Sequence, residues 1–149
     1  MITNEQLLTT EEYATLVETA HDDSLRHGFT VYLIAETGLR RSEAAKFIPE
    51  WLDEMKQVVD VPYEDDEGSP SAKHRARRIP LTDTAVENLT AYTEALNHDA
   101  FGVSGSTIYD RINRAGEITG FDVVTPSMLR QMYAIRLQNR GVPFEAISE

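Results

Sequence analysis

Cysteine is absent from the 149-residue sequence, and this absence excludes disulfide scaffolds, thiolate zinc sites, iron–sulfur clusters and cysteine nucleophiles. Long hydrophobic runs are also missing, since apolar stretches such as residues 29–35 are far too short to cross a bilayer. The N-terminus lacks the basic start and the apolar core of a signal peptide. We therefore expect a soluble, cytoplasmic protein with no membrane partner.

Basic residues are few: 14 Lys and Arg oppose 25 Asp and Glu, for a net charge of −11 and a pI near 4.7. That balance alone disfavours a nucleic-acid partner, because phosphate binding usually accompanies a basic surface. The distribution points the other way, since residues 71–80 carry a net +4 and residues 111–140 a net +3. A solvated helix or hairpin face is the simpler explanation of such basic stretches. The acidic remainder suits a halophile-like surface, which keeps a protein soluble in concentrated salt.

Apolar spacing and capping residues predict the secondary structure. A capping box between Thr9 and Glu12 begins the first helix. Gly38 ends a second helix that is apolar almost all round and hence central, and Ser42 caps a short third helix. Helices are predicted over residues 9–21, 29–36, 42–47, 82–96, 104–120 and 126–140, and strands over 58–61 and 77–81. No repeat or long linker divides the chain, so we expect one domain over residues 1–149, mainly α with a small antiparallel β-sheet (α+β).

Three basic residues differ from ordinary surface charge. Arg40 follows the sharp turn at Gly38, where its forked guanidinium suits a phosphate or a carboxylate. Lys73 lies in or next to the turn of the predicted hairpin, from which it could swing over a bound ligand. Arg130 is flanked by apolar residues, and burial of a guanidinium requires a partner. For each residue taken alone, a structural ion pair or a snorkelling side chain is the alternative.

Taken together, these segments resemble the catalytic domain of tyrosine recombinases, the phage integrases. The chain contains, in the family's order, LLTTEEYATLVETA, TGLRRSE, a basic hairpin ending in IPL, STIYDRINRAGEITGF and the pattern LRxxYxIxxxNxG. The resemblance covers nearly the whole chain. It implies site-specific DNA recombination or integration, in which duplex DNA is broken and rejoined through a phosphotyrosine.

The resemblance also assigns roles to individual residues. Arg40 and Arg130 become the catalytic arginines that hold the scissile phosphate and stabilise its transition state. Lys73 becomes the general acid for the departing 5′ hydroxyl, because the pKa of arginine is too high for that role. Glu43 orients the turn at Arg40. The other expected contacts to phosphate or to the DNA backbone are Ser127, His74, Arg41, Arg75, Arg77, Arg78, Ser106, Thr107, Arg111 and Arg114.

Two departures from the family pattern follow in the sequence. The family's second box usually reads HxxR and then His, whereas Ser127 and Gln131 occupy those positions here. Among the residues that follow Arg130, Tyr133 is expected to pack in the core rather than to attack phosphate. We therefore expect a chain that lacks the C-terminal nucleophile segment and is inactive alone. A fragment of an active recombinase and a degenerate core that binds DNA without cutting it both fit these features.

Partners and cofactors follow from the same reasoning. No metal or cofactor is expected, because the arginines supply the transition-state charge and the four histidines show no HxxxH or HxH pairing. Duplex DNA is the expected partner. The chain is expected to be a monomer in isolation, and the complete protein a homotetramer on DNA. A rival hypothesis from another class is an acidic helical interaction protein with no role on DNA.

Overall fold

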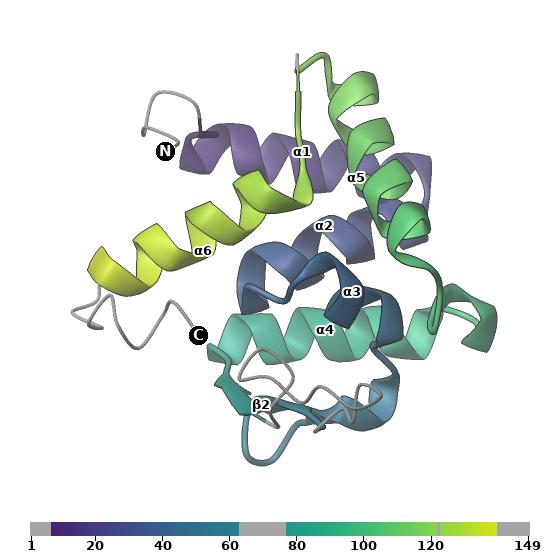
Figure 1. Cartoon of the computed structure of the whole chain (residues 1–149), viewed down its shortest axis with the longest axis vertical. Helices are drawn as coiled ribbons and strands as arrows, with labels where there is room; N and C mark the ends of the chain where they lie inside the picture. Colours follow the sequence, from purple (N-terminus) through teal and green to yellow (C-terminus); the bar gives the residue numbers. More distant parts are fainter. Residues whose placement is uncertain (1–6, 63–76, 122, 140–149) are drawn as a thin grey trace, which may run out of the picture.

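Helix α2 (Leu25–Thr37) lies at the centre of the molecule, as its apolar sequence predicted (Figure 1). The computed structural model describes residues 7–62, 77–121 and 123–139. Four longer helices pack against α2: α1 (Thr10–Asp23), α4 (Asp83–Ala95), α5 (Gly105–Thr119) and α6 (Pro126–Asn139). The shorter elements are α3 (Arg41–Lys46), the 3₁₀ turns η2 (Pro49–Trp51) and η4 (His98–Ala100), and the strands β1 (Leu52–Asp53), β2 (Val58–Val61) and β3 (Arg77–Pro80).

Capping residues set the helix ends, and most of them agree with the sequence prediction. The box at the start of α1 is confirmed, since Thr9 N donates to Glu12 Oε1 at 2.9 Å and Glu12 N donates to Thr9 Oγ1 at 3.0 Å. Helix α2 begins four residues earlier than predicted, because Ser24 Oγ accepts from the backbone of Arg26 at 3.2 Å. The prediction that Ser42 caps α3 is wrong. The N-cap is Arg40, two residues earlier, whose extended backbone has φ −67° and ψ 156°.

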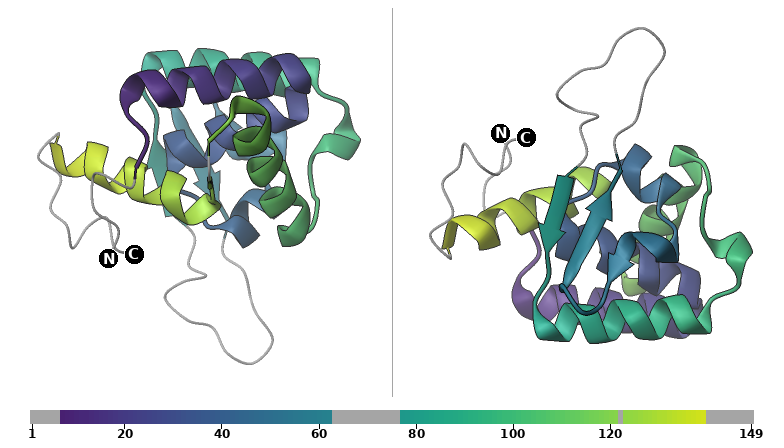
Figure 2. Two further views of the ribbon diagram at one scale, coloured as in Figure 1. Left: turned by 90° about the horizontal axis from the view of Figure 1, so that it is seen from above. Right: turned by 90° about the horizontal axis from the view of Figure 1, so that it is seen from below.

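The sheet has three antiparallel strands in the order β1-β2-β3, one more than the sequence predicted (Figure 2). Val59 pairs with Ile79 across β2 and β3, and both side chains are buried in the core. Asp60 pairs with Arg78 on the opposite face, where the carboxylate and the guanidinium lie 2.7 Å apart. Strand alternation therefore sorts the residues of β3 into a face toward the helices and a face away from them.

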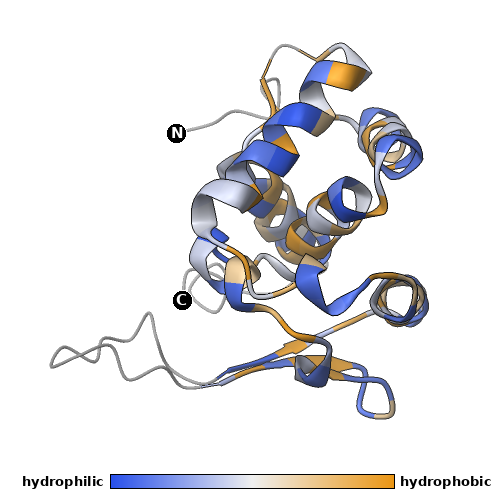
Figure 3. Cartoon of the chain, turned by 90° about the vertical axis from the view of Figure 1, so that its right-hand side faces the viewer, coloured by the Kyte–Doolittle hydropathy of each residue, from blue (hydrophilic) through white to orange (hydrophobic). Residues whose placement is uncertain are grey.

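The core is one contiguous cluster between the central helix and its neighbours, with hydrophobic segments turned toward it (Figure 3). Phe29 of α2 packs against Phe47 and Phe101, with ring centroids 5.6 and 5.4 Å apart. The fold is mainly α with a small antiparallel sheet, as predicted. No helix in the described part of the chain is both long enough and apolar enough to span a bilayer.

Candidate functional site

The turn between α2 and α3 positions the first predicted site residue. Gly38 ends α2 in the left-handed conformation, with φ 70° and ψ 18°, and its N–H donates to Ile34 O at 2.8 Å. Glycine adopts this conformation without a steric penalty. The turn also needs space, because a Cβ on Gly38 would overlap Cδ2 of the Tyr133 ring in α6. The chain then leaves the turn with Arg40 at the start of α3.

Glu43 holds this turn from within α3. Its side chain is buried, and Oε1 accepts from the backbone N–H of Arg40 at 2.9 Å. The same oxygen accepts from Nη2 of Arg77 at 2.8 Å, and Oε2 lies 3.9 Å from Nη1 of Arg40. One buried carboxylate therefore joins a helix start to strand β3.

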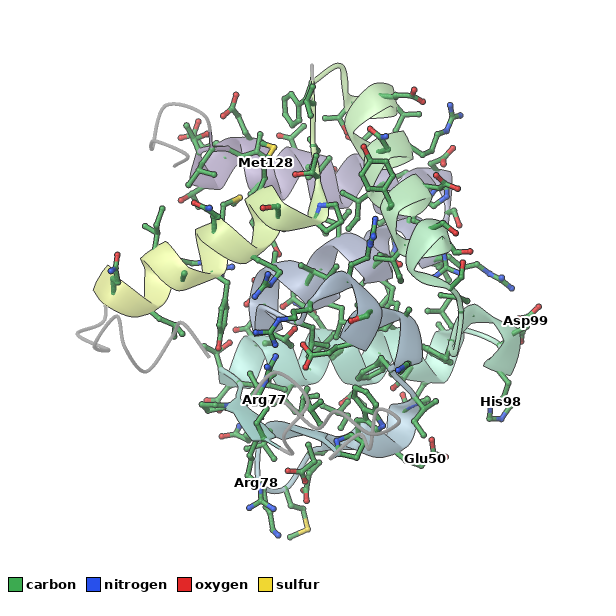
Figure 4. The ribbon with its side chains drawn as sticks, viewed as in Figure 1. Glu50, Arg77, Arg78, His98, Asp99 and Met128 are labelled. Atoms are coloured by element: carbon green, nitrogen blue, oxygen red, sulfur yellow. The ribbon has the colours of Figure 1, made fainter. Side chains whose placement is uncertain are left out.

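Arg77 reaches Glu43 because of its position on β3. Alternation along the strand places Arg77 on the same face as buried Ile79, toward the helices. In Figure 4, Arg77 points into the body of the molecule, whereas Arg78 points away from it. The sequence grouped both residues as DNA-backbone contacts. Their alternation along a predicted strand was the signal that could have separated them.

Arg130 joins this group from α6. Its Nε donates to the carbonyl oxygen of Gly38 at 3.1 Å, across 92 positions of sequence. Burial lowers the pKa of Arg130, and the positive charges of Arg40 and Arg77 lower it further, while Glu43 opposes them. The structure therefore brings together Arg40, Arg130 and Glu43 as the sequence predicted, and adds Arg77.

This group carries more positive than negative charge. The guanidiniums of Arg40 and Arg77 pair with the carboxylate of Glu43, and the guanidinium of Arg130 lies against the Gly38 carbonyl, close enough to sense all three charges. These four side chains have a formal charge of +2. The lowered pKa of Arg130 reflects first the burial of its guanidinium and then the positive charges of Arg40 and Arg77. A bound oxyanion would offset both effects, and arginine forks match the geometry of phosphate oxygens. The arrangement can therefore hold a phosphate and stabilise charge that develops on it.

A second polar surface adjoins α3 at the start of α5. The guanidinium of Arg41 lies 5.9 Å from the ring centroid of Tyr109. Ser104 Oγ lies 3.0 Å from both Ser106 Oγ and Thr107 Oγ1. The backbone ties the two elements together, because the N–H of residue 103 donates to the carbonyl of residue 45 at 2.7 Å. Three predicted DNA contacts, Arg41, Ser106 and Thr107, thus lie on neighbouring elements.

Other predicted contacts lie apart from this group. Arg111 is only 7% exposed, and its Nη1 donates to Thr30 Oγ1 at 3.3 Å and to the carbonyl oxygen of Ala100 at 3.2 Å. Such a buried guanidinium ties α5 to α2 and is not available to DNA, so we correct its assignment to a structural one. Arg78 pairs with Asp60 on the outer face of the sheet, and exposed Arg114 lies 4.0 Å from Asp23 of α1.

The remaining predicted residues divide between α6 and segments outside the described residues. Ser127 is exposed in the first turn of α6, three residues before Arg130. Lys73, His74 and Arg75 lie outside the described residues. Within the described residues, no group of three or more His, Cys, Asp or Glu side chains is placed to hold a metal ion. Tyr133 is partly buried and packs against the core, as predicted.

Comparison with known proteins gives consistent matches. A model described as the phage integrase family matches residues 6–149. The chain resembles the crystal structure of XerA recombinase with TM-score 0.75 and 24% identity, over 95% of this chain and 53% of that chain. A Tn1549 transposon integrase in complex with a circular intermediate DNA gives 0.70 and 16% identity, over 95% and 55%. A lambda integrase dimer bound to a COC′ core site gives 0.67 and 18%, over 95% and 55%. The chain thus spans just over half the length of these structures, and no curated protein sequence matches it.

Proposed function

The chain belongs to the phage integrase family, and from this premise we propose that it forms the phosphate-binding catalytic domain of a site-specific DNA recombinase. The observation that supports the proposal is the gathering of three arginines at the α2–α3 turn: Arg40 and Arg77 pair with Glu43, and Arg130 donates to the Gly38 carbonyl beside them. A recombinase breaks and rejoins DNA at a phosphodiester, so its site must stabilise negative charge on phosphate oxygens. The proposed domain is one unit over residues 1–149.

The proposed chemistry is phosphoryl transfer without a metal or cofactor. Arg40 and Arg130 would hold the scissile phosphate between the α2–α3 turn and α6 and stabilise the transition state. Glu43 would act indirectly, by fixing the backbone of Arg40 and the side chain of Arg77. Lys73 would protonate the departing 5′ hydroxyl. Tyr133 is not proposed as the attacking group, because its ring packs against the Gly38 turn.

Duplex DNA is the proposed partner of this surface. Arg41, Ser106 and Thr107 would contact the backbone beside the scissile phosphate, because α3 and the start of α5 are joined. Further proposed contacts are Ser127, His74, Arg75, Arg78 and Arg114. We also propose a cytoplasmic protein with a halophile-like acidic surface, monomeric in isolation and tetrameric on DNA when complete.

The phosphate site predicts how duplex binding responds to mutation. The double variant Arg40→Ala/Arg130→Ala should weaken binding of a short DNA duplex at low salt by about tenfold or more. It should also make the plot of log affinity against log salt shallower by about 1, since one phosphate contact is lost. Fluorescence anisotropy across a salt series measures both quantities.

The matched control removes one arginine at the other end of α2. Arg26 pairs with exposed Asp99 at 2.7 Å, and Arg26→Ala should leave the salt dependence unchanged. An unchanged duplex affinity in the double variant, with thermal unfolding that shows an intact fold, would favour the acidic interaction protein instead.

A second candidate function is DNA binding without cleavage. Ser127 and Gln131 occupy positions where the family usually has histidine, and Ser127 is exposed beside the site rather than held in it. A nicked suicide substrate distinguishes the two functions, using the longest natural form of the protein. Covalent trapping on the DNA is the expected result for a recombinase. A protected footprint with no covalent product would instead identify a DNA-binding protein built on this core.

A further inference from the structure

A second arginine of α6, Arg136, also contacts the end of α2. Its Nη2 donates to the carbonyl oxygen of Ala35, and its Nη1 lies 3.1 Å from Oε2 of Glu36. Arg130, one and two-thirds turns earlier, donates to the carbonyl oxygen of Gly38. The ring of Tyr133 packs on Gly38 between them. Helix α6 therefore meets the last turn of α2 through two arginines and an aromatic ring.

The chemistry of a helix end explains why arginines occupy these positions. The final carbonyl groups of an α-helix have no partner within the helix and carry partial negative charge. Arg136 satisfies one of these groups at Ala35, and Arg130 satisfies the carbonyl in the turn that follows. Because the two arginines donate to carbonyl groups at two heights along the helix axis, they fix both the position of α6 along α2 and the distance between the two helices.

Helix α1 supports Arg136 from the other side. Tyr13 OH donates to Oε2 of Glu36 at 3.1 Å, and the guanidinium of Arg136 lies 5.7 Å from the Tyr13 ring centroid. Burial and the neighbouring Glu36 raise the pKa of Tyr13, so its hydroxyl remains a donor at physiological pH. The Glu36 carboxylate is also well shielded, with a side chain only 14% exposed. Tyr13, Glu36 and Arg136 thus form one closed network across three helices.

We propose that Arg136, held by Glu36 and Tyr13, is a positioning residue that sets α6 on α2 and thereby aims Arg130 into the phosphate site. The inference rests on the proposed function of Arg130 as a phosphate ligand. Arg136 itself faces Ala35 and Glu36, so it contributes through Arg130 rather than by touching DNA. Small displacements of a charged group at a reacting phosphate are costly, and a fixed helix prevents them.

The first arm of the test measures the position of Arg130 without DNA. In protein labelled with ¹⁵N-arginine, Arg136→Lys and Glu36→Gln should shift the Nε–H signal of Arg130 and speed its exchange with solvent. Tyr13→Phe keeps the ring under Arg136 but removes the hydroxyl, and should produce a smaller change in the same direction. Arg26→Lys, at the other end of α2, should leave the signal unchanged. An Arg130 signal that is the same in all variants would overturn the inference.

The second arm asks whether the effect passes through Arg130. Arg136→Lys should weaken binding of a short DNA duplex about fivefold when Arg130 is present, and have no effect when Arg130 is already alanine. Equal losses in both backgrounds would show that Arg136 contacts DNA itself, and would overturn its positioning role. If the Arg130 signal moves while Arg40→Ala/Arg130→Ala leaves duplex affinity intact, the positioning stands and the proposed function fails.

Discussion

Replacing Glu43 with alanine is expected to lower the free energy of unfolding by about 3–5 kcal/mol, the usual cost of removing one partner from a buried charge pair. The variant removes the carboxylate that pairs with Arg40 and Arg77, and it removes the negative charge that offsets the nearby Arg130. It also removes the acceptor of the Arg40 backbone N–H. Urea denaturation at low salt measures the loss.

Two further variants and an added anion test whether the loss comes from the missing charge of Glu43. Glu43→Gln keeps an acceptor for the Arg40 N–H but removes the negative charge, so it should fall between the alanine variant and the wild type. Glu50 is exposed, and Glu50→Ala should change stability by no more than about 0.5 kcal/mol. Added inorganic sulfate should stabilise Glu43→Ala more than the wild type, because the anion replaces the missing charge. If sulfate stabilised both proteins equally, the loss in Glu43→Ala would not come from uncompensated positive charge on the neighbouring arginines.

Local signals in the sequence explain why most helix ends were predictable. A capping box, a left-handed glycine and a proline in the first turn each act within one turn of a helix, so the sequence displays them directly. Strand β1 was missed because Leu52 and Asp53 form a strand only through pairing with β2. Ser42 was assigned the wrong role because α3 begins at Arg41, which makes Arg40 the N-cap, two residues before Ser42. The backbone N–H of Arg40 is satisfied by the side chain of Glu43.

The sequence predicted the two central arginines of the site but not the contacts that hold them. Arg40 and Arg130 were identified through a resemblance of motifs, and the structure places Arg130 against the carbonyl of Gly38, in the turn that leads to Arg40. Helical spacing could have separated Arg111, which is buried, from exposed Arg114, because Arg111 shares the buried face of Ile108, Ile112 and Ala115. The sequence prediction grouped both arginines by charge alone. The Glu36 network was not predicted, although an isolated carboxylate near the end of an apolar helix signals a need for a partner.

Net charge was the most misleading of the global features. The sum of −11 describes the composition of the whole chain, whereas a phosphate responds mainly to the charges nearest to it. The described side chains of Arg40, Glu43, Arg77 and Arg130 sum to a positive charge, and the arginines come from three separate segments of the chain. An acidic protein can therefore present a cationic site, because folding gathers cations that the sequence spreads apart.

The Gly38→Ala variant is expected to lose about 3 kcal/mol of stability, from two sources that add. A left-handed backbone at φ 70° disfavours any residue with a Cβ, and that Cβ would overlap the Tyr133 ring. Moving the ring displaces α6, so duplex affinity should fall together with stability. Thermal or urea unfolding gives the first quantity, and anisotropy on the folded variant gives the second.

Gly102 provides the matched control, because it has a similar φ of 64° and, among the described residues, no atom would lie within 4 Å of a Cβ added there. Gly102→Ala should therefore show only the backbone cost, about 1 kcal/mol, and leave duplex affinity unchanged. The difference between the two variants isolates the contact with Tyr133. Shortening that side chain with Tyr133→Ala should make Gly38→Ala no more costly than Gly102→Ala. If Gly38→Ala still lost about 3 kcal/mol in the Tyr133→Ala protein, the whole cost would come from the backbone of the turn. That result would contradict a role for the Gly38–Tyr133 contact in positioning α6.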